Sequence, residues 1–158
     1  MYDYQLPDAA LSSWLLLART WSALYKVEDR KLAKVGLTPE QLDVLRLSRD
    51  YPIPLTPAEI ARSLFRENQT IAGLLTRMER EGLVRRVPKR KGKPFTEVQI
   101  TAKGEELCQP GIDVATSVIT KLMSCLSPKE HEQLQKLLRK LRGKALEELY
   151  MELLPPPS

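Results

Sequence analysis

The chain has 158 residues, of which 42% are hydrophobic and 28% are charged, and it carries a formal net charge of +5. This length fits one ordinary domain, or a small domain with helical extensions. Two cysteines and one histidine are too few for a disulfide framework, a zinc site or serine–histidine catalysis. The chain has no long apolar run, and its N-terminus lacks the basic start of a signal peptide. We therefore expect a cytoplasmic protein with no membrane partner, metal or cofactor, in which Cys108 and Cys125 are reduced and buried.

The first predicted helix follows Asp8, a suitable N-cap, and is apolar on two sides. One stripe contains Leu11, Trp14, Leu15, Ala18, Ser22 and Tyr25, and the other contains Leu17, Trp21 and Leu24. A helix that is apolar on two sides needs two partners. One partner is the chain's own core, and the other is a neighbouring helix or another subunit.

A second helix begins at a clear start signal. Thr38 is its predicted N-cap, Pro39 occupies the first helical position, and Gln41 completes a capping box. Two prolines, Pro52 and Pro54, end this helix.

Two further helices are predicted to form a helix-turn-helix. The first starts at Thr56 and Pro57 and runs through Phe65, and the second starts at Asn68, the expected N-cap, and ends at Gly82. Apolar residues at i, i+3, i+4 and i+7 give the second helix a buried face: Ile71, Leu74, Leu75 and Met78. Its free face carries small or hydrogen-bonding residues, which suit contact with a DNA groove: Gln69, Thr70, Gly73, Thr76, Arg77 and Arg80.

A basic hairpin follows this helix. Leu83 and Val84 lead into a run of six cations, and Val98 and Ile100 alternate with polar residues on the predicted return strand. The six cations are Arg85, Arg86, Lys89, Arg90, Lys91 and Lys93. A cationic loop between two short strands is typical of a wing, and a local excess of positive charge predicts an anionic partner. The alternative is that the charges form a solvated surface.

The C-terminal part is predicted to be helical. Thr101 is the expected N-cap of a helix in which Pro110 and Gly111 predict a kink or a break. A further helix after Pro128 carries an apolar stripe, and the tail from Pro155 cannot be helical. The fold class is therefore mainly α with a small β-hairpin wing, a winged helix-turn-helix with N- and C-terminal helical extensions.

Three regions follow from this pattern. Residues 1–36 form an N-terminal dimerisation helix, residues 37–101 form the winged helix-turn-helix, and residues 102–158 form C-terminal dimerisation helices with a tail. The terminal helices have more apolar surface than a small winged domain needs, so we expect a homodimer. The residues predicted to mediate dimerisation are Leu11, Leu15, Leu17, Leu134, Leu138, Leu141 and Leu149.

Five short segments together resemble the MarR family of bacterial regulators, which includes the SlyA-like proteins. Each is weak alone, but they occur in the family's order and at similar spacing. They are LTPEQL at 37–42, like the family's LTxxQ; PAEIARSL at 57–64, like ELAxxL; RMEREGLV at 77–84, like RLExxGLV; ITAKG at 100–104, like LTxxG; and LSPKE at 126–130, like LSxxE.

The resemblance implies a triangular homodimer of transcriptional regulators, usually repressors. Many members of the family release DNA when a small phenolic or similar lipophilic anion binds between the dimerisation and DNA-binding regions. Gly92, Lys93 and Pro94 replace the family's usual Asp-Arg-Arg in the wing, so its Asp–Arg support is absent and Lys93 or Arg90 becomes the tip cation. The first helix also lacks the cysteine of the family's peroxide sensors.

The sequence therefore predicts a non-enzymatic regulator that binds a palindromic operator in double-stranded DNA. The expected DNA-binding residues are Thr56, Asn68, Gln69, Thr70, Gly73, Thr76, Arg77, Arg86, Lys89, Arg90, Lys91 and Lys93. Trp14, Trp21 and Tyr25 are candidate ligand-binding residues, although the same rings could instead pack between subunits. The alternative function is a winged-helix module that binds protein or RNA and does not read DNA sequence.

Overall fold

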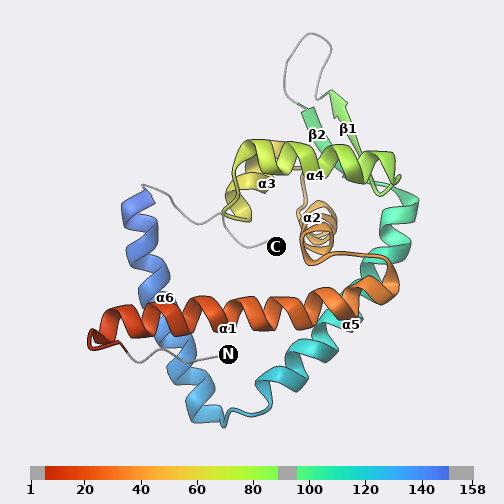
Figure 1. The fold of residues 1–158 in the computed structure, drawn as a ribbon. Helices are drawn as coiled ribbons and strands as arrows, with labels where there is room; N and C mark the ends of the chain where they lie inside the picture. The colour runs from red at the N-terminus through yellow and green to blue at the C-terminus, as the bar shows by residue number, and fades with distance from the viewer. Residues whose placement is uncertain (1–5, 89–95, 150–158) are drawn as a thin grey trace.

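The computed structural model describes residues 6–88 and 96–149. Within them, helices α2, α3 and α4 and a two-stranded hairpin form one body, and the longer helices α1, α5 and α6 extend from it (Figure 1). The elements in chain order are α1 (Ala9–Leu32), a short 3-10 turn (Ala33–Val35), α2 (Pro39–Asp50), α3 (Pro57–Ser63), α4 (Asn68–Arg80), β1 (Val84–Pro88), β2 (Thr96–Ile100), α5 (Ala102–Met123) and α6 (Pro128–Leu149). This architecture confirms the predicted fold class.

Two capping boxes start α2 and α3, as the sequence predicts. At α2, the backbone N–H of Gln41 donates to the Thr38 hydroxyl oxygen at 3.2 Å, and the backbone N–H of Thr38 donates to the Gln41 side chain at 2.9 Å. Thr56 and Glu59 repeat this exchange at α3. Each box satisfies backbone donors that the first helical turn leaves unpaired, which defines where these helices begin.

The turn between α3 and α4 differs in detail from the expectation. Helix α3 ends at Ser63, two residues earlier than predicted, and Phe65 adopts a positive φ of 52°. The N-cap of α4 is Glu67, and Asn68 is already the first helical residue, so the prediction of Asn68 as N-cap is wrong. The reason is local, because Glu67 rather than Asn68 has the extended backbone that a cap position requires.

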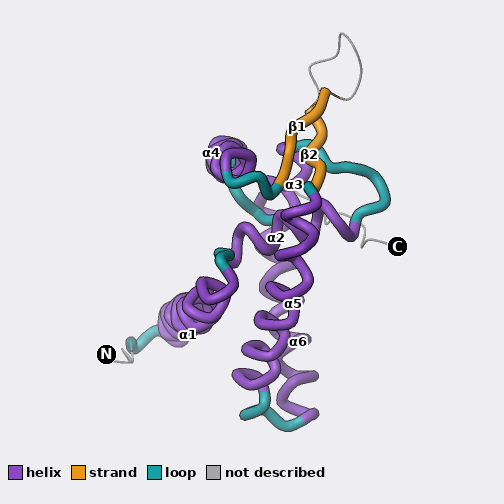
Figure 2. Tube along the Cα trace, turned by 90° about the vertical axis from the view of Figure 1, so that its right-hand side faces the viewer, coloured by secondary structure: helices purple, strands orange, loops and turns teal. Residues whose placement is uncertain are grey.

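Gly82 connects α4 to the hairpin. Its φ is +76°, a conformation that glycine adopts without strain, and its N–H donates to the Glu79 carbonyl at 2.9 Å. The chain then enters β1, which pairs with β2 in antiparallel register, with Val84 opposite Ile100. The N–H of Val98 donates to the Leu55 carbonyl at 2.8 Å, so β2 is also held to the segment before α3. Figure 2 shows the hairpin standing beside α4.

One hydrophobic core joins the winged body to the long helices. All four residues predicted on the inner face of α4, Ile71, Leu74, Leu75 and Met78, are buried. The core also contains Leu32 at the end of α1 and Cys108 and Ala115 on α5. Helices α1 and α5 therefore start or end inside the same packed interior as the helix-turn-helix.

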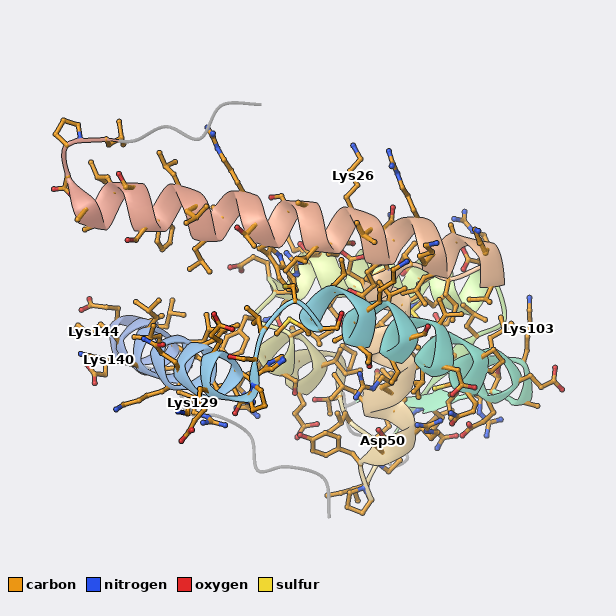
Figure 3. The ribbon with its side chains drawn as sticks, turned by 90° about the horizontal axis from the view of Figure 1, so that it is seen from below. Lys26, Asp50, Lys103, Lys129, Lys140 and Lys144 are labelled. Atoms are coloured by element: carbon orange, nitrogen blue, oxygen red, sulfur yellow. The ribbon has the colours of Figure 1, made fainter. Side chains whose placement is uncertain are left out.

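The outer parts of the long helices are uncovered within one chain. Among the residues predicted to mediate dimerisation, Leu15 and Leu134 are half-buried, and the other five are exposed. Leu11 is 55% exposed, Leu141 58% and Leu149 57%. The basic residue Lys26 projects away from the rest of the molecule on α1 (Figure 3). No helix of the described residues is long and apolar enough to cross a membrane.

Two expectations for the C-terminal half need correction. Helix α5 runs without interruption through Pro110, so the alternative of a break is wrong. The helix packs closely against Leu37 at this point, since a Cβ on Gly111 would lie 2.8 Å from Leu37 Cδ1. This close packing accounts for the continuity of the helix next to Pro110. Cys108 is buried as predicted, and burial raises the pKa of its thiol, whereas Cys125 is exposed, contrary to the prediction. Cys125 follows the end of α5, where a short link to α6 leaves little to cover it.

Glycine substitutions test how tightly α5 is packed on the winged body. A Cβ at Gly104 would lie 2.2 Å from the Leu83 carbonyl oxygen, a backbone atom that cannot move aside. We expect Gly104→Ala to lower the free energy of unfolding by about 3 kcal/mol. A Cβ at Gly143 on α6 meets nothing within 4 Å of the chain, so the matched Gly143→Ala change should raise stability by about 0.5–1 kcal/mol. Urea unfolding measures both; equal effects would contradict the packing of α5.

Candidate DNA-binding interface and the cavity behind it

The outward face of α4 is the candidate DNA-reading surface. Gln69, Gly73, Thr76 and Arg80 recur at i, i+4, i+7 and i+11, and all four are exposed. This stripe lies opposite the buried residues Ile71, Leu75 and Met78 because the helical period is 3.6 residues. Nothing within 4 Å would meet a Cβ at Gly73, so the helix surface there is open. The face is thus smooth and polar, and it can approach another surface closely.

Thr76 lies in the middle of this face with a defined orientation. Its hydroxyl donates to the Ala72 carbonyl at 2.9 Å, and the same oxygen accepts from Arg86 Nη2 at 3.3 Å. These contacts join the reading helix to the first strand of the hairpin.

Thr70 and Arg77 lie to one side of the outward face. Both are exposed, and both line a cavity beneath α4. Their side chains therefore lie between the predicted DNA surface and the interior of the molecule. A ligand in that cavity would contact the reading helix directly.

Glu79 and Arg86 connect the opposite side of α4 to the hairpin. The backbone N–H of Arg86 donates to Glu79 Oε1 at 2.7 Å, and Arg86 Nε donates to Glu79 Oε2 at 2.7 Å. The Arg86 hydrogen bond lowers the pKa of the Glu79 carboxyl, helped by the backbone donor. The contact is thus present above the ordinary carboxyl pKa and is lost only as the pH falls through the lowered value. Glu79 thus holds the first strand of the hairpin to α4.

The remaining predicted DNA-binding residues are distributed as follows. Asn68 is exposed in the first turn of α4. The hydroxyl of Thr56 is engaged in the cap of α3, where it donates to Glu59 Oε2 at 2.9 Å. The charge of Arg86 is engaged by Glu79. The wing residues Lys89, Arg90, Lys91 and Lys93, and the replaced motif at Gly92 to Pro94, lie outside the described residues.

The cavity beneath α4 has a volume of about 950 Å³ and is lined by residues of α1, α2, the end of α3, the α3–α4 turn, α4 and α5. Trp21 and Tyr25 of α1 line it, with ring centroids 6.3 Å apart, whereas Trp14 is not among its lining residues. The structure thus brings two of the three candidate ligand-binding aromatics to one cavity. Trp14 is 68% exposed and lies about two turns from Trp21 on the same helix.

Ionisable groups in this cavity are perturbed by burial and by one another. Burial and a hydrogen bond to Glu40 raise the pKa of the Tyr25 hydroxyl. Burial raises the pKa of Glu28, and the negative charge of Asp43 adds to it. Burial also raises the pKa of Asp43, against the opposing effect of Arg46.

Sequence reasoning left several residues of both surfaces out of the predicted sites. The sequence places Arg80 on the free face of α4 with Gln69, Gly73 and Thr76, although the expected DNA-binding residues do not include it. Glu79, Glu28 and Asp43 gave no such signal, because each acquires its partner from another element. Among the described residues, no group of side chains could hold a metal ion.

A short helix, a turn, a polar-faced second helix and a hairpin define this chain as a winged helix-turn-helix protein. A family model described as MarR family matches residues 35–93. Transcriptional regulator HosA of Escherichia coli is 32% identical over 105 residues, which make up 66% of this chain and 77% of that protein. The chain belongs to the MarR family, and it is a DNA-binding transcription regulator rather than an enzyme.

Solved structures share the whole fold. The organohalide-sensing transcriptional regulator RdhR-CbdbA1625, in its 2,4-dichlorophenol-bound form, superposes with a TM-score of 0.85 at 20% identity, covering 98% of this chain and 97% of that one. MepR of S. aureus in complex with DNA has a TM-score of 0.77 at 25% identity, covering 82% of this chain and 96% of that one. The predicted resemblance to the family is therefore confirmed.

The Glu79–Arg86 contact can be tested by Glu79→Gln. We expect affinity for a specific operator to fall by about tenfold, since a charge-assisted contact holding the wing to α4 is lost. Affinity for unrelated DNA should not fall, because the positive charge of Arg86 is no longer neutralised by Glu79 and can contact phosphates. Fluorescence anisotropy with both DNAs measures this, and Glu106→Gln on the exposed side of α5 is the matched control. An equal loss on both DNAs would contradict a positioning role.

Proposed function

We propose that this protein is a homodimeric repressor that reads a palindromic operator with α4. The observation that supports this most directly is the exposed polar face of Gln69, Gly73, Thr76 and Arg80 on a helix whose other side is buried in the core. A helix of this kind enters the major groove of B-DNA, and two copies related by a two-fold axis read half-sites about 34–36 Å apart. The proposed place of action is the cytoplasm.

Individual side chains have distinct proposed roles. Gln69 can pair with the N6 and N7 atoms of adenine, and Gly73 allows the helix close approach to the bases. Asn68, Thr70, Thr76 and Arg77 are proposed to reach phosphates or base edges near the two ends of the contact. Thr56 lies at the start of the preceding helix, where a backbone phosphate would pass. The wing cations Arg86, Lys89, Arg90, Lys91 and Lys93 would supply charge to the DNA backbone.

The dimer is proposed to form through the terminal helices, residues 1–36 and 102–158. The support is the uncovered apolar surface of α1 and α6, including Leu11, Leu17, Leu138, Leu141 and Leu149. Soluble monomers rarely keep large apolar patches exposed, and a two-fold dimer would cover the same stripe on both copies. The winged body, residues 37–101, would then extend from each side.

Control by a small ligand is the third part of the proposal. The cavity beneath α4 is lined by the aromatic residues Trp21 and Tyr25 and also by Thr70 and Arg77 of the reading helix. The structurally similar RdhR-CbdbA1625 was crystallised with 2,4-dichlorophenol. A ligand here would favour an orientation of α4 that no longer fits successive major grooves, and DNA would be released.

Titration against the DNA upstream of the protein's own gene tests the DNA-binding proposal. At two salt concentrations, specific binding should exceed binding to unrelated DNA by about a thousandfold or more. Lys91→Ala and Lys93→Ala should each weaken binding to all DNA and lower the salt slope by about one. Weak binding without preference for a palindrome would instead indicate a module for protein or RNA. Unchanged affinity and salt dependence in both variants would refute the role of the wing.

The dimer proposal predicts that Leu141→Asp produces monomers. A carboxylate placed in an apolar dimer interface would lose its hydration without gaining a partner. This costs several kcal/mol, which is more than loss of the leucine contact alone would cost. Lys136→Asp is the control, since it lies about 140° round α6 from Leu141. Sedimentation velocity gives the mass of each variant. Dimers of Leu141→Asp at micromolar concentration would rule out this face of α6.

A further inference from the structure

Two helix stripes line the cavity beneath α4. On α1, Trp21, Tyr25 and Glu28 recur at i, i+4 and i+7, and on α2, Glu40, Asp43 and Arg46 recur at i, i+3 and i+6. Residues at these spacings share one side of a helix, and all six line the cavity. One end of the cavity thus combines aromatic rings with three carboxylates.

The positive charges at this end do not balance the carboxylates. Glu40 already has partners, since Arg66 Nη2 lies 3.8 Å from its Oε1 and the Tyr25 hydroxyl donates to it. The positive charge of Arg46 acts on both Glu28 and Asp43, and that of Arg66 also acts on Asp43. Within the part of the chain that the structure describes, neither Glu28 nor Asp43 forms an ion pair or a side-chain hydrogen bond. Three carboxylates, those of Glu28, Glu40 and Asp43, therefore share two guanidinium groups, those of Arg46 and Arg66.

The charged groups at the other end of the cavity do not offset this excess of carboxylates. Gln41 Nε2 donates to Glu81 Oε2 at 2.7 Å, so Glu81 is engaged by a neutral group. Arg77 of α4 is exposed and belongs to the predicted DNA-binding surface. Burial is the main cause of the raised pKa values of Glu28 and Asp43, and a neighbouring carboxylate raises each of them further.

The aromatic side chains are suited to a positive ligand. A cation is attracted to the face of a tryptophan or tyrosine ring. Trp21, which is 61% exposed, and Tyr25 both line the cavity, and their ring planes are tilted by 51° to each other. An aromatic anion at this end would instead lie beside Glu28 and Asp43 and would have to compete with them for Arg46.

We propose that the cavity of Trp21, Tyr25, Glu28 and Asp43 binds a lipophilic cation, such as an aromatic or quaternary ammonium compound, in preference to an aromatic anion. This rests on the proposed function in one respect, that the cavity is the effector site. The carboxylates provide the attraction for the charge, the rings contact its apolar groups, and Thr70 and Arg77 carry the effect to α4.

Calorimetric titration of the full chain without DNA tests the preference for a cation. The probes are benzyltrimethylammonium and 3-phenylpropionate, which are aromatic, similar in size and opposite in charge. We expect the cation to bind at least about tenfold more tightly than the anion. Glu28→Gln combined with Asp43→Asn should remove that preference, whereas Glu106→Gln should retain it. Thermal unfolding of each variant shows that it is folded.

A second pair of variants locates the ligand within the cavity. Trp21→Leu should weaken binding of benzyltrimethylammonium by about threefold or more, because a cation–π contact is lost. Trp14→Leu should leave the affinity unchanged, since Trp14 does not line the cavity.

Three results would overturn the inference: equal or tighter binding of 3-phenylpropionate, binding of neither probe, or a preference that survives Glu28→Gln with Asp43→Asn. These results leave the proposed DNA-binding function untouched, because no DNA is present. A chain that binds the cation but no operator would contradict the proposed function and support the ligand class.

Discussion

The burial of one side of α4 is the constraint on which the rest of the arrangement depends. Ile71, Leu75 and Met78 are almost completely inaccessible to solvent, and burying each large aliphatic side chain contributes roughly 1.5–3 kcal/mol. A shift of one residue turns a helix by about 100° and would bring this stripe out of the core. Such a loss is comparable to the whole stability of a small domain, about 5–15 kcal/mol. The rotational position of α4 is therefore closely defined.

This rotational position gives each remaining side of α4 different surroundings. Gln69, Gly73, Thr76 and Arg80 are directed outward, Thr70 and Arg77 border the cavity, and Glu79 faces β1. A change at the cavity wall must therefore be transmitted to the outward face and, through Glu79 and Arg86, to the hairpin. Because the cavity-lining residues and the outward-facing residues belong to the same helix, a small movement of that helix would change the position of both.

The long helices combine two kinds of apolar surface. Leu32 on α1 and Cys108 and Ala115 on α5 are buried in the core of the winged body, whereas Leu11 and Leu17 further along α1 are exposed. A movement of the exposed parts would reach the core through continuous helices. The exposed parts of α1 are thus continuous with residues that pack in the same core as α4.

The sequence by itself determined the elements whose signals are local. Capping boxes at Thr38 and Thr56, the apolar period of α4 and the positive φ of Gly82 all arise from residues within a few positions of one another, and each was predicted or is explained by spacing alone. Two expectations were wrong for different reasons. Helix α5, which packs on the core on both sides of Pro110, is not broken there, and Glu67 rather than Asn68 has the extended backbone of the α4 cap.

Only the tertiary structure decided which side chains meet. The Glu79–Arg86 contact joins a helix to a strand, and the cavity brings Glu28 of α1 beside Asp43 of α2. No periodic pattern encodes either meeting, because each depends on the angle between two elements that the core sets. The sequence thus specified a winged reader of DNA, and packing decided how its wing is held and what charge its cavity presents to a ligand.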